Sequence, residues 1–317
     1  MIGAVAGCQS LPATTGTGVE ADAGVDVDVS DPVICATRGG ARGLSRREIT
    51  IDGLRRTFWV YLPPEAPATQ PLPLVVAFHG YTMSGKSMYD ITQYQALADR
   101  ETIALAFPDG QGGPNSVLSP WNVGAGVCPT NFGLPPVATG DDFALLDFIK
   151  ADVALDQCVD RDHVFVTGFS MGGYFTNHAG CMRSDIRAIA PHSGGAHELA
   201  GCLVSRKPVI LFHGSLDPLV PPGCSDPNAR PIPNVTPAAD AWAEHNGCST
   251  TTTSRMEGDA TCIHYEACPA DGQVELCTFE GMGHCWAGGA ASGGIYACPN
   301  RGSATELEWR FFKQYAW

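Results

Sequence analysis

The sequence is poor in charged residues and especially poor in basic ones. Only 16% of its 317 residues are charged, and 19 Lys and Arg stand against 33 Asp and Glu, which gives a formal net charge of −14. An acidic surface repels nucleic acid and anionic lipid headgroups, so we exclude a nucleic-acid-binding protein. A neutral or weakly charged small-molecule partner fits this charge better.

The sequence also lacks an apolar run of the roughly 18 residues that a membrane-spanning helix needs. No Cys-x(2–4)-Cys or His-x(3–5)-His spacing occurs with the matching second pair that a zinc site requires. His264 lies two residues from Cys262 and His284 abuts Cys285, but neither pair has a counterpart. We therefore expect no metal and no cofactor.

Cysteine, in contrast, is abundant, with 13 residues. This number is typical of proteins that carry disulfides and predicts an exported protein, extracellular, cell-surface or periplasmic. Twelve cysteines lie between Cys35 and Cys298, an even set that can pair completely in many ways.

Cys8 stands apart from that set and ends the segment 1–8, MIGAVAGC, which resembles a bacterial lipobox without its basic start. We expect a truncated signal or lipobox-like segment whose true start lies upstream, with Cys8 as a candidate lipidation site and membrane tether. A frayed tail with a chance cysteine is the alternative.

Residues 9–34 are rich in Thr, Gly, Ala and Asp and contain no aromatic or basic residue, which predicts a disordered acidic tether. Residues 35–317 are long enough for one large core, and we expect a single catalytic domain there, acting as a monomer.

Within 35–317, short β-rich runs alternate with helical patterns. This order predicts an α/β fold with a mostly parallel central sheet flanked by helices. An antiparallel strand pair is expected first, over 47–53 and 56–63, and one helix over 87–101. The remaining expected strands cover 72–80, 102–110, 163–170, 186–195, 207–215 and 273–281, and the remaining expected helices cover 139–157, 174–182, 236–247 and 303–317.

The sharpest motif is Gly-Phe-Ser-Met-Gly, 168–172, which stands between an apolar strand and a helix. A Gly-x-Ser-x-Gly elbow in this context lifts the serine hydroxyl above the sheet as a nucleophile. The acid and base of such a site follow later in the chain, which predicts the order Ser170, Asp217, His284, with both partners on loops after strands. Asp226 and Asp240 are rival acids. The backbone N–H groups of Met171 and Tyr81 are the expected oxyanion donors.

These residues give the chain a resemblance to the secreted α/β-hydrolase esterases that include feruloyl esterases, acetylxylan esterases and polyhydroxybutyrate depolymerases. The matching pieces are FHGYTMSG, GFSMGGYFTNHAGC, HGSLDPLVP and GMGHCWAGG, and the resemblance implies the same triad of Ser170, Asp217 and His284. Cysteine contexts such as EHNGC resemble the feruloyl esterase branch, whereas GMGHCWAGG resembles the polyhydroxybutyrate depolymerase branch.

We accordingly expect a serine carboxylic-ester hydrolase that forms an acyl-enzyme, acting on plant cell-wall esters such as feruloylated or acetylated xylan. A polyester depolymerase is the alternative, and a serine peptidase or a non-catalytic surface lipoprotein is less favoured. Trp121, Trp286 and Thr82 are candidate substrate-binding residues, because they stand on loops beside the expected site. Cys285 is the expected half of a disulfide that holds the His284 loop.

Overall fold

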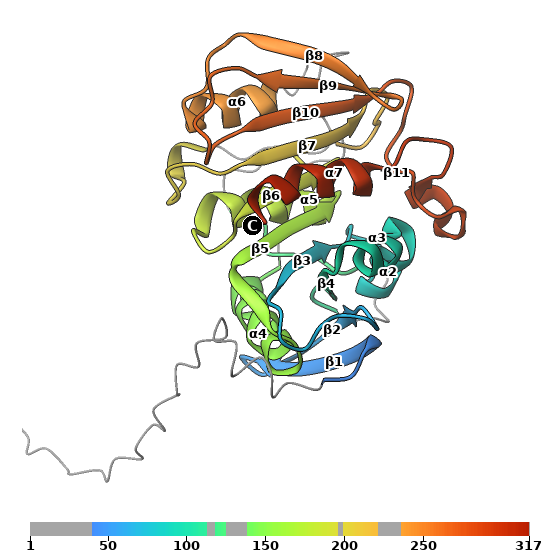
Figure 1. Ribbon diagram of the computed structural model, residues 1–317. Coiled ribbons are helices and arrows are strands. Elements are labelled where there is room, and N and C mark those ends of the chain that lie inside the picture. Colours follow the sequence, from blue (N-terminus) through green and yellow to red (C-terminus); the bar gives the residue numbers. More distant parts are fainter. Residues whose placement is uncertain (1–39, 113–117, 125–137, 196–198, 221–235, 317) are drawn as a thin grey trace, which may run out of the picture.

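The protein is built around one twisted sheet with helices on both faces, as the computed structural model shows (Figure 1). The structure describes residues 40–112, 118–124, 138–195, 199–220 and 236–316. Six neighbouring strands in these ranges run parallel, in the order β4-β3-β5-β6-β7-β10. Their bounds are Ala104–Pro108 (β4), Leu72–Phe78 (β3), Val159–Phe169 (β5), Ala188–His192 (β6), Val209–Gly214 (β7) and Val274–Phe279 (β10). The predicted α/β-hydrolase fold, with its mostly parallel sheet, is confirmed.

Antiparallel pairs extend this sheet at both edges. β1 (Gly43–Ile51) and β2 (Leu54–Leu62) form the predicted N-terminal pair, and β2 runs antiparallel to β4. At the other edge, β9 (Ala260–Tyr265) pairs with β10, and β8 (Thr252–Glu257) pairs with β9. The sequence pattern did not predict β8 and β9.

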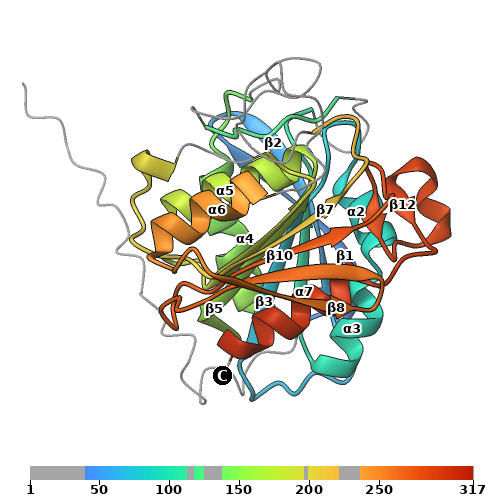
Figure 2. The same cartoon turned by 90° about the horizontal axis from the view of Figure 1, so that it is seen from above.

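The two faces of the sheet carry separate hydrophobic cores, because successive side chains of a strand point to opposite faces. In β3, Leu74, Val76 and Phe78 belong to one core, and Val75 and Ala77 belong to the other. Figure 2 shows the three layers: α4, α5 and α6 cover the first face, and α2, α3 and α7 cover the second. These helices span Asp142–Asp156 (α4), Met171–Met182 (α5), Thr236–Asn246 (α6), Gly85–Thr92 (α2), Tyr94–Glu101 (α3) and Ala304–Phe312 (α7).

The single helix expected over 87–101 is two helices, because the chain breaks at Gln93. This residue has the left-handed φ of 55°, which cannot continue an α-helix. Its side-chain amide donates to the carbonyl of Gly288 at 2.6 Å, so a distant segment holds the break in place. The remaining short elements of the described residues are η1 (Leu199–Gly201), β11 (Trp286–Ala287), η2 (Ala291–Tyr296), β12 (Ala297–Cys298) and η3 (Lys313–Tyr315).

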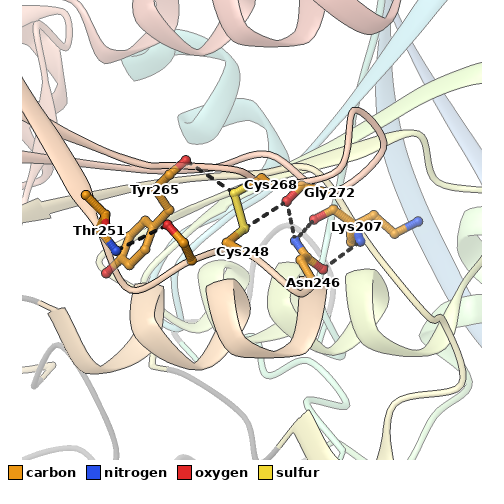
Figure 3. Close-up of a disulfide and its surroundings, with 8 residues drawn as sticks. Lys207, Asn246, Cys248, Thr251, Tyr265, Cys268 and Gly272 are labelled. Atoms are coloured by element: carbon orange, nitrogen blue, oxygen red, sulfur yellow. Dashed lines mark hydrogen bonds between the residues drawn. A yellow bond between two sulfur atoms is a disulfide. The ribbon is translucent and has the colours of Figure 1, made fainter.

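Four disulfides lie within the described residues, each joining cysteines that are 13 to 21 positions apart, as Cys181–Cys202, Cys248–Cys268, Cys262–Cys277 and Cys285–Cys298. Figure 3 shows one of them, which ties the end of α6 to the segment between β9 and β10. Beside it the side chain of Asn246 accepts from the N–H of Lys207 and donates to the carbonyls of Lys207 and Gly272. The covalent and polar links together hold the outer strands to the parallel sheet.

Across the ranges that the structure describes, no helix has the length and apolar character to cross a membrane, and no group of three metal-ligating side chains is found. The segment 1–8 with Cys8, the tether 9–34 and the rival acid Asp226 lie outside the described residues.

Candidate active site

Ser170 stands at a sharp turn between β5 and α5, where the Gly-x-Ser-x-Gly motif predicts it. Its backbone has a φ of 56° and a ψ of −117°, a strained conformation for a residue with a side chain. The Ser170 N–H donates to the carbonyl of His192 at the end of β6, at 2.9 Å, and the Ser170 carbonyl accepts from the N–H of Tyr174. The neighbouring strand and the new helix therefore hold the turn from both sides.

Only glycine fits at the positions two residues before and two residues after this serine. A Cβ at Gly172 would lie 2.0 Å from the carbonyl oxygen of Phe78, and one at Gly168 would lie 2.3 Å from the carbonyl oxygen of Gly172. These distances are far below any van der Waals contact, so the close approach of α5 to β3 and β5 requires both glycines.

Asp217 and His284 come together because the two strands before them are neighbours. β7 and β10 run parallel with Gly214 opposite Phe279, so the loops that follow leave the sheet side by side (Figure 1). His284 Nδ1 lies 2.7 Å from Asp217 Oδ2, and both side chains are nearly buried. On its other side the His284 ring lies 4.8 Å, centroid to centroid, from the ring of Phe169, which precedes Ser170.

The Asp217 carboxylate has a defined orientation. Its Oδ1 accepts from the backbone N–H groups of Leu219 and Val220, at 2.9 and 3.1 Å, which leaves Oδ2 for His284. Burial opposes ionisation, but the hydrogen bond from His284 and the neighbouring histidines outweigh it, so the pKa of Asp217 lies below its ordinary value. An ionised Oδ2 can only accept a hydrogen bond, so Nδ1 carries the hydrogen of the neutral imidazole and Nε2 is left as the acceptor.

The loop after β3, residues 79–84, lies against the serine. A Cβ at Gly80 would lie 3.2 Å from the Cβ of Ser170, so this glycine permits the contact. His79 is fully buried; its Nε2 accepts from the N–H of Gly110, and its Nδ1 therefore donates to the carbonyl of Gly80. Burial lowers the pKa of His79 to about 4, so the ring is neutral at pH 7. Its two hydrogen bonds link the loop 79–84 to Gly110. The carbonyl of Tyr81 accepts from the N–H of Ser119.

Two of the candidate substrate-binding residues are placed differently from the prediction. The rings of Trp121 and Trp286 are both fully buried, so a substrate cannot contact either one, and this corrects the suggested substrate walls. Trp121 packs edge-on against Phe78 and donates to the carbonyl of His79. Trp286 stacks on His192, with ring centroids 3.7 Å apart. Both tryptophans thus pack against residues next to the site, Trp121 at His79 and Trp286 at His192.

The rival acid Asp240 is excluded by its position in the structure. It lies on α6 and accepts a hydrogen bond from the hydroxyl of Tyr265 at 2.6 Å, whereas the only carboxylate bonded to His284 among the described residues is Asp217.

Thr82, the third candidate, is exposed and meets a residue that the sequence did not single out. Its Oγ1 lies 2.6 Å from the phenol oxygen of Tyr296, in the 285–298 loop, which runs from Cys285 to Cys298. A disulfide closes this loop at its ends, which confirms that Cys285 is half of a disulfide. Tyr296 was missed because only the pairing with Cys298, which the sequence does not specify, brings it back to the site.

The parallel sheet, with Ser170, Asp217 and His284 placed after the ends of its strands, has the α/β-hydrolase fold. Comparison with known proteins agrees. Residues 51–183 match a family described as putative esterase. Feruloyl esterase B of Piromyces equi is 31% identical over 226 residues, which are 67% of this chain and 39% of the relative. A probable feruloyl esterase C of Aspergillus terreus is 30% identical over 135 residues, 41% of this chain and 46% of the relative.

Among solved structures, an acetyl xylan esterase from Aspergillus awamori superposes with a TM-score of 0.60 at 16% identity, covering 85% of this chain and 99% of that one, which shows the shared fold. The chain spans less than half the length of the two curated relatives. The resemblance to esterases is confirmed: the chain is similar in sequence to curated feruloyl esterases and shares its fold with an acetyl xylan esterase.

Proposed function

We propose that the protein is an exported serine esterase that hydrolyses carboxylic esters of the plant cell wall. The observation that carries this proposal is the Asp217–His284 pair, 2.7 Å apart at neighbouring strand ends, beside a serine in a strained elbow. Relatives named feruloyl esterase and the similarity to an acetyl xylan esterase support the substrate class. The disulfides support an oxidising compartment.

In the mechanism, the Ser170 hydroxyl attacks the ester carbonyl while His284 Nε2 takes its proton. The negative charge that develops on the carbonyl oxygen is stabilised by the N–H groups of Tyr81 and Met171, which is the usual function of an oxyanion hole. The carbonyl re-forms as the C–O bond to the alcohol breaks, and His284 gives its proton to the leaving oxygen. Water then attacks the acyl-Ser170 ester by the same steps in reverse and releases the acid.

Apolar side chains are exposed beside Asp217 and near Tyr81. They support a substrate whose acyl or alcohol part is not strongly hydrated. Leu216, next to Asp217, is 65% exposed, and Leu118, next to the residue that bonds Tyr81, is 50% exposed. Exposed leucines that adjoin catalytic loops can bury themselves against an apolar ligand.

The proposal is tested with the purified 317-residue chain and a panel of p-nitrophenyl acetate, methyl ferulate, feruloylated and acetylated xylan, and a polyhydroxybutyrate suspension. Ferulate or acetate release that disappears in Ser170→Ala supports the proposal. Hydrolysis that persists in Ser170→Ala contradicts the nucleophile, and clearing of the polymer without release from xylan supports the polyester alternative instead.

A further inference from the structure

The 285–298 loop joins the two halves of the proposed site. It starts at the residue after His284 and carries Tyr296 to within hydrogen-bond distance of Thr82, two residues beyond the glycine that contacts Ser170. In both Figure 1 and Figure 2 this segment lies beside α2, the helix that begins directly after the loop 79–84.

Several independent contacts make the loop rigid. The Cys285–Cys298 disulfide and the pairing of Trp286 with Ala297 in β11 and β12 fix its two ends. Its middle docks on α2, where the N–H of Ala290 donates to the carbonyl of Ile91 at 2.9 Å. The position of Tyr296 is therefore set before any ligand arrives, which lowers the entropy lost on binding.

The hydroxyls of Tyr296 and Thr82 form a polar pair at the exposed surface. Each hydroxyl has one hydrogen and can accept two hydrogen bonds, so the bond between them uses one hydrogen and leaves the other, with several lone pairs, for a ligand. Ile295, 81% exposed, and the Tyr296 ring add apolar surface next to the pair. Paired hydroxyl groups beside an aromatic ring match the donors, acceptors and C–H faces of a sugar.

The location of this pair indicates which part of the ester it meets. His284 must give its proton to the leaving oxygen, so the alcohol part of the ester lies on the His284 side of Ser170. Tyr296 belongs to the loop that the disulfide holds to the residue after His284. We propose that Tyr296 and Thr82 form a subsite for the sugar alcohol of the substrate, which makes them specificity-determining residues; this rests on the proposed esterase function.

The test compares two esters of ferulic acid that differ only in the alcohol: methyl ferulate and a feruloylated arabinose-containing oligosaccharide. In Tyr296→Phe, which removes one oxygen atom, kcat/KM for the saccharide ester relative to the methyl ester should fall about fivefold, the value of one hydrogen bond, through a higher KM. Thr82→Val should do the same, and the double variant should lose little more than either single one, because the two hydroxyls act as a unit.

Tyr89→Phe is the matched control, because Tyr89 lies on α2 and its hydroxyl bonds to Gln95 away from the pair. The ratio in this variant should equal that of the wild type. Equal ratios in Tyr296→Phe, Thr82→Val and the wild type, with melting temperatures unchanged, would overturn the subsite and leave the esterase proposal in place. Absence of any Ser170-dependent hydrolysis of either ester would overturn both.

Discussion

Replacement of Asp217 by asparagine tests the acid–base pair most directly, because the surroundings of the carboxylate dictate how the new amide must sit. Oδ1 of Asp217 accepts hydrogen bonds from the backbone N–H groups of Leu219 and Val220. The amide of the Asp217→Asn variant would keep its oxygen there, since its NH₂ group would otherwise face two donors. The NH₂ group is then directed at Nδ1 of His284, where the carboxylate oxygen had been.

An NH₂ group can only donate, so Nδ1 must become an acceptor and the proton moves to Nε2. The imidazole then has the wrong tautomer to take the proton of Ser170. The same tautomer error in a serine protease costs about 10⁴ in kcat, which equals about 5.5 kcal/mol of activation free energy. We expect a loss of that size in Asp217→Asn.

The assay is steady-state hydrolysis of p-nitrophenyl acetate, with the melting temperature as a measure of folding. Asp240→Asn is the matched control, because that carboxylate bonds to Tyr265 on α6 and should leave kcat within about twofold. A loss below about tenfold in a folded Asp217→Asn protein would refute the reasoning and would mean that another group orients His284.

Three further predictions concern stability and are each read from urea unfolding. Gly172→Ala should destabilise the protein by about 3 kcal/mol or more, because its Cβ would lie 2.0 Å from a carbonyl oxygen, whereas Gly201→Ala, with open space around it, should be near neutral. Between pH 6.5 and 4 the unfolded state binds a proton at His79 and the folded state does not, so stability should fall by up to about 3 kcal/mol as the pH drops; a flat profile would contradict this. Removing the Cys285–Cys298 disulfide with two alanines should cost about 3 kcal/mol, and no change would show that the docking of the loop on α2 suffices.

The parallel sheet and the elbow were readable from the sequence because their signals are local. Continuous apolar runs mark buried strands, and the glycines around Ser170 mark a turn that no other residue fits. The strand ends also predicted the order Ser170, Asp217 and His284 for the nucleophile, the acid and the base. The edge strand β8 could not be predicted from the sequence, because nearly all of its residues are exposed and show no alternation between apolar and polar positions.

Other features depended on contacts between distant segments. The break at Gln93 is held by a carbonyl 195 positions away. Trp121 and Trp286 have the local sequence of exposed loops, yet packing against Phe78 and His192 buries both rings. Tyr296 became part of the site only through a disulfide partner that the sequence left open. The features that the sequence did not predict thus depend on contacts between residues far apart in the chain.

The closed ends of the 285–298 loop have a consequence for how this protein could change its substrate. Because the disulfide and the β11–β12 pairing fix where the loop leaves and rejoins the molecule, the exposed residues at its tip can be exchanged without moving His284. Directed evolution confined to Ala291, Ser292, Ile295 and Tyr296 would therefore alter alcohol preference while the position of His284 stays constant; Gly293 and Gly294 are left out because of the contact with Ile91 and the left-handed φ of 57°.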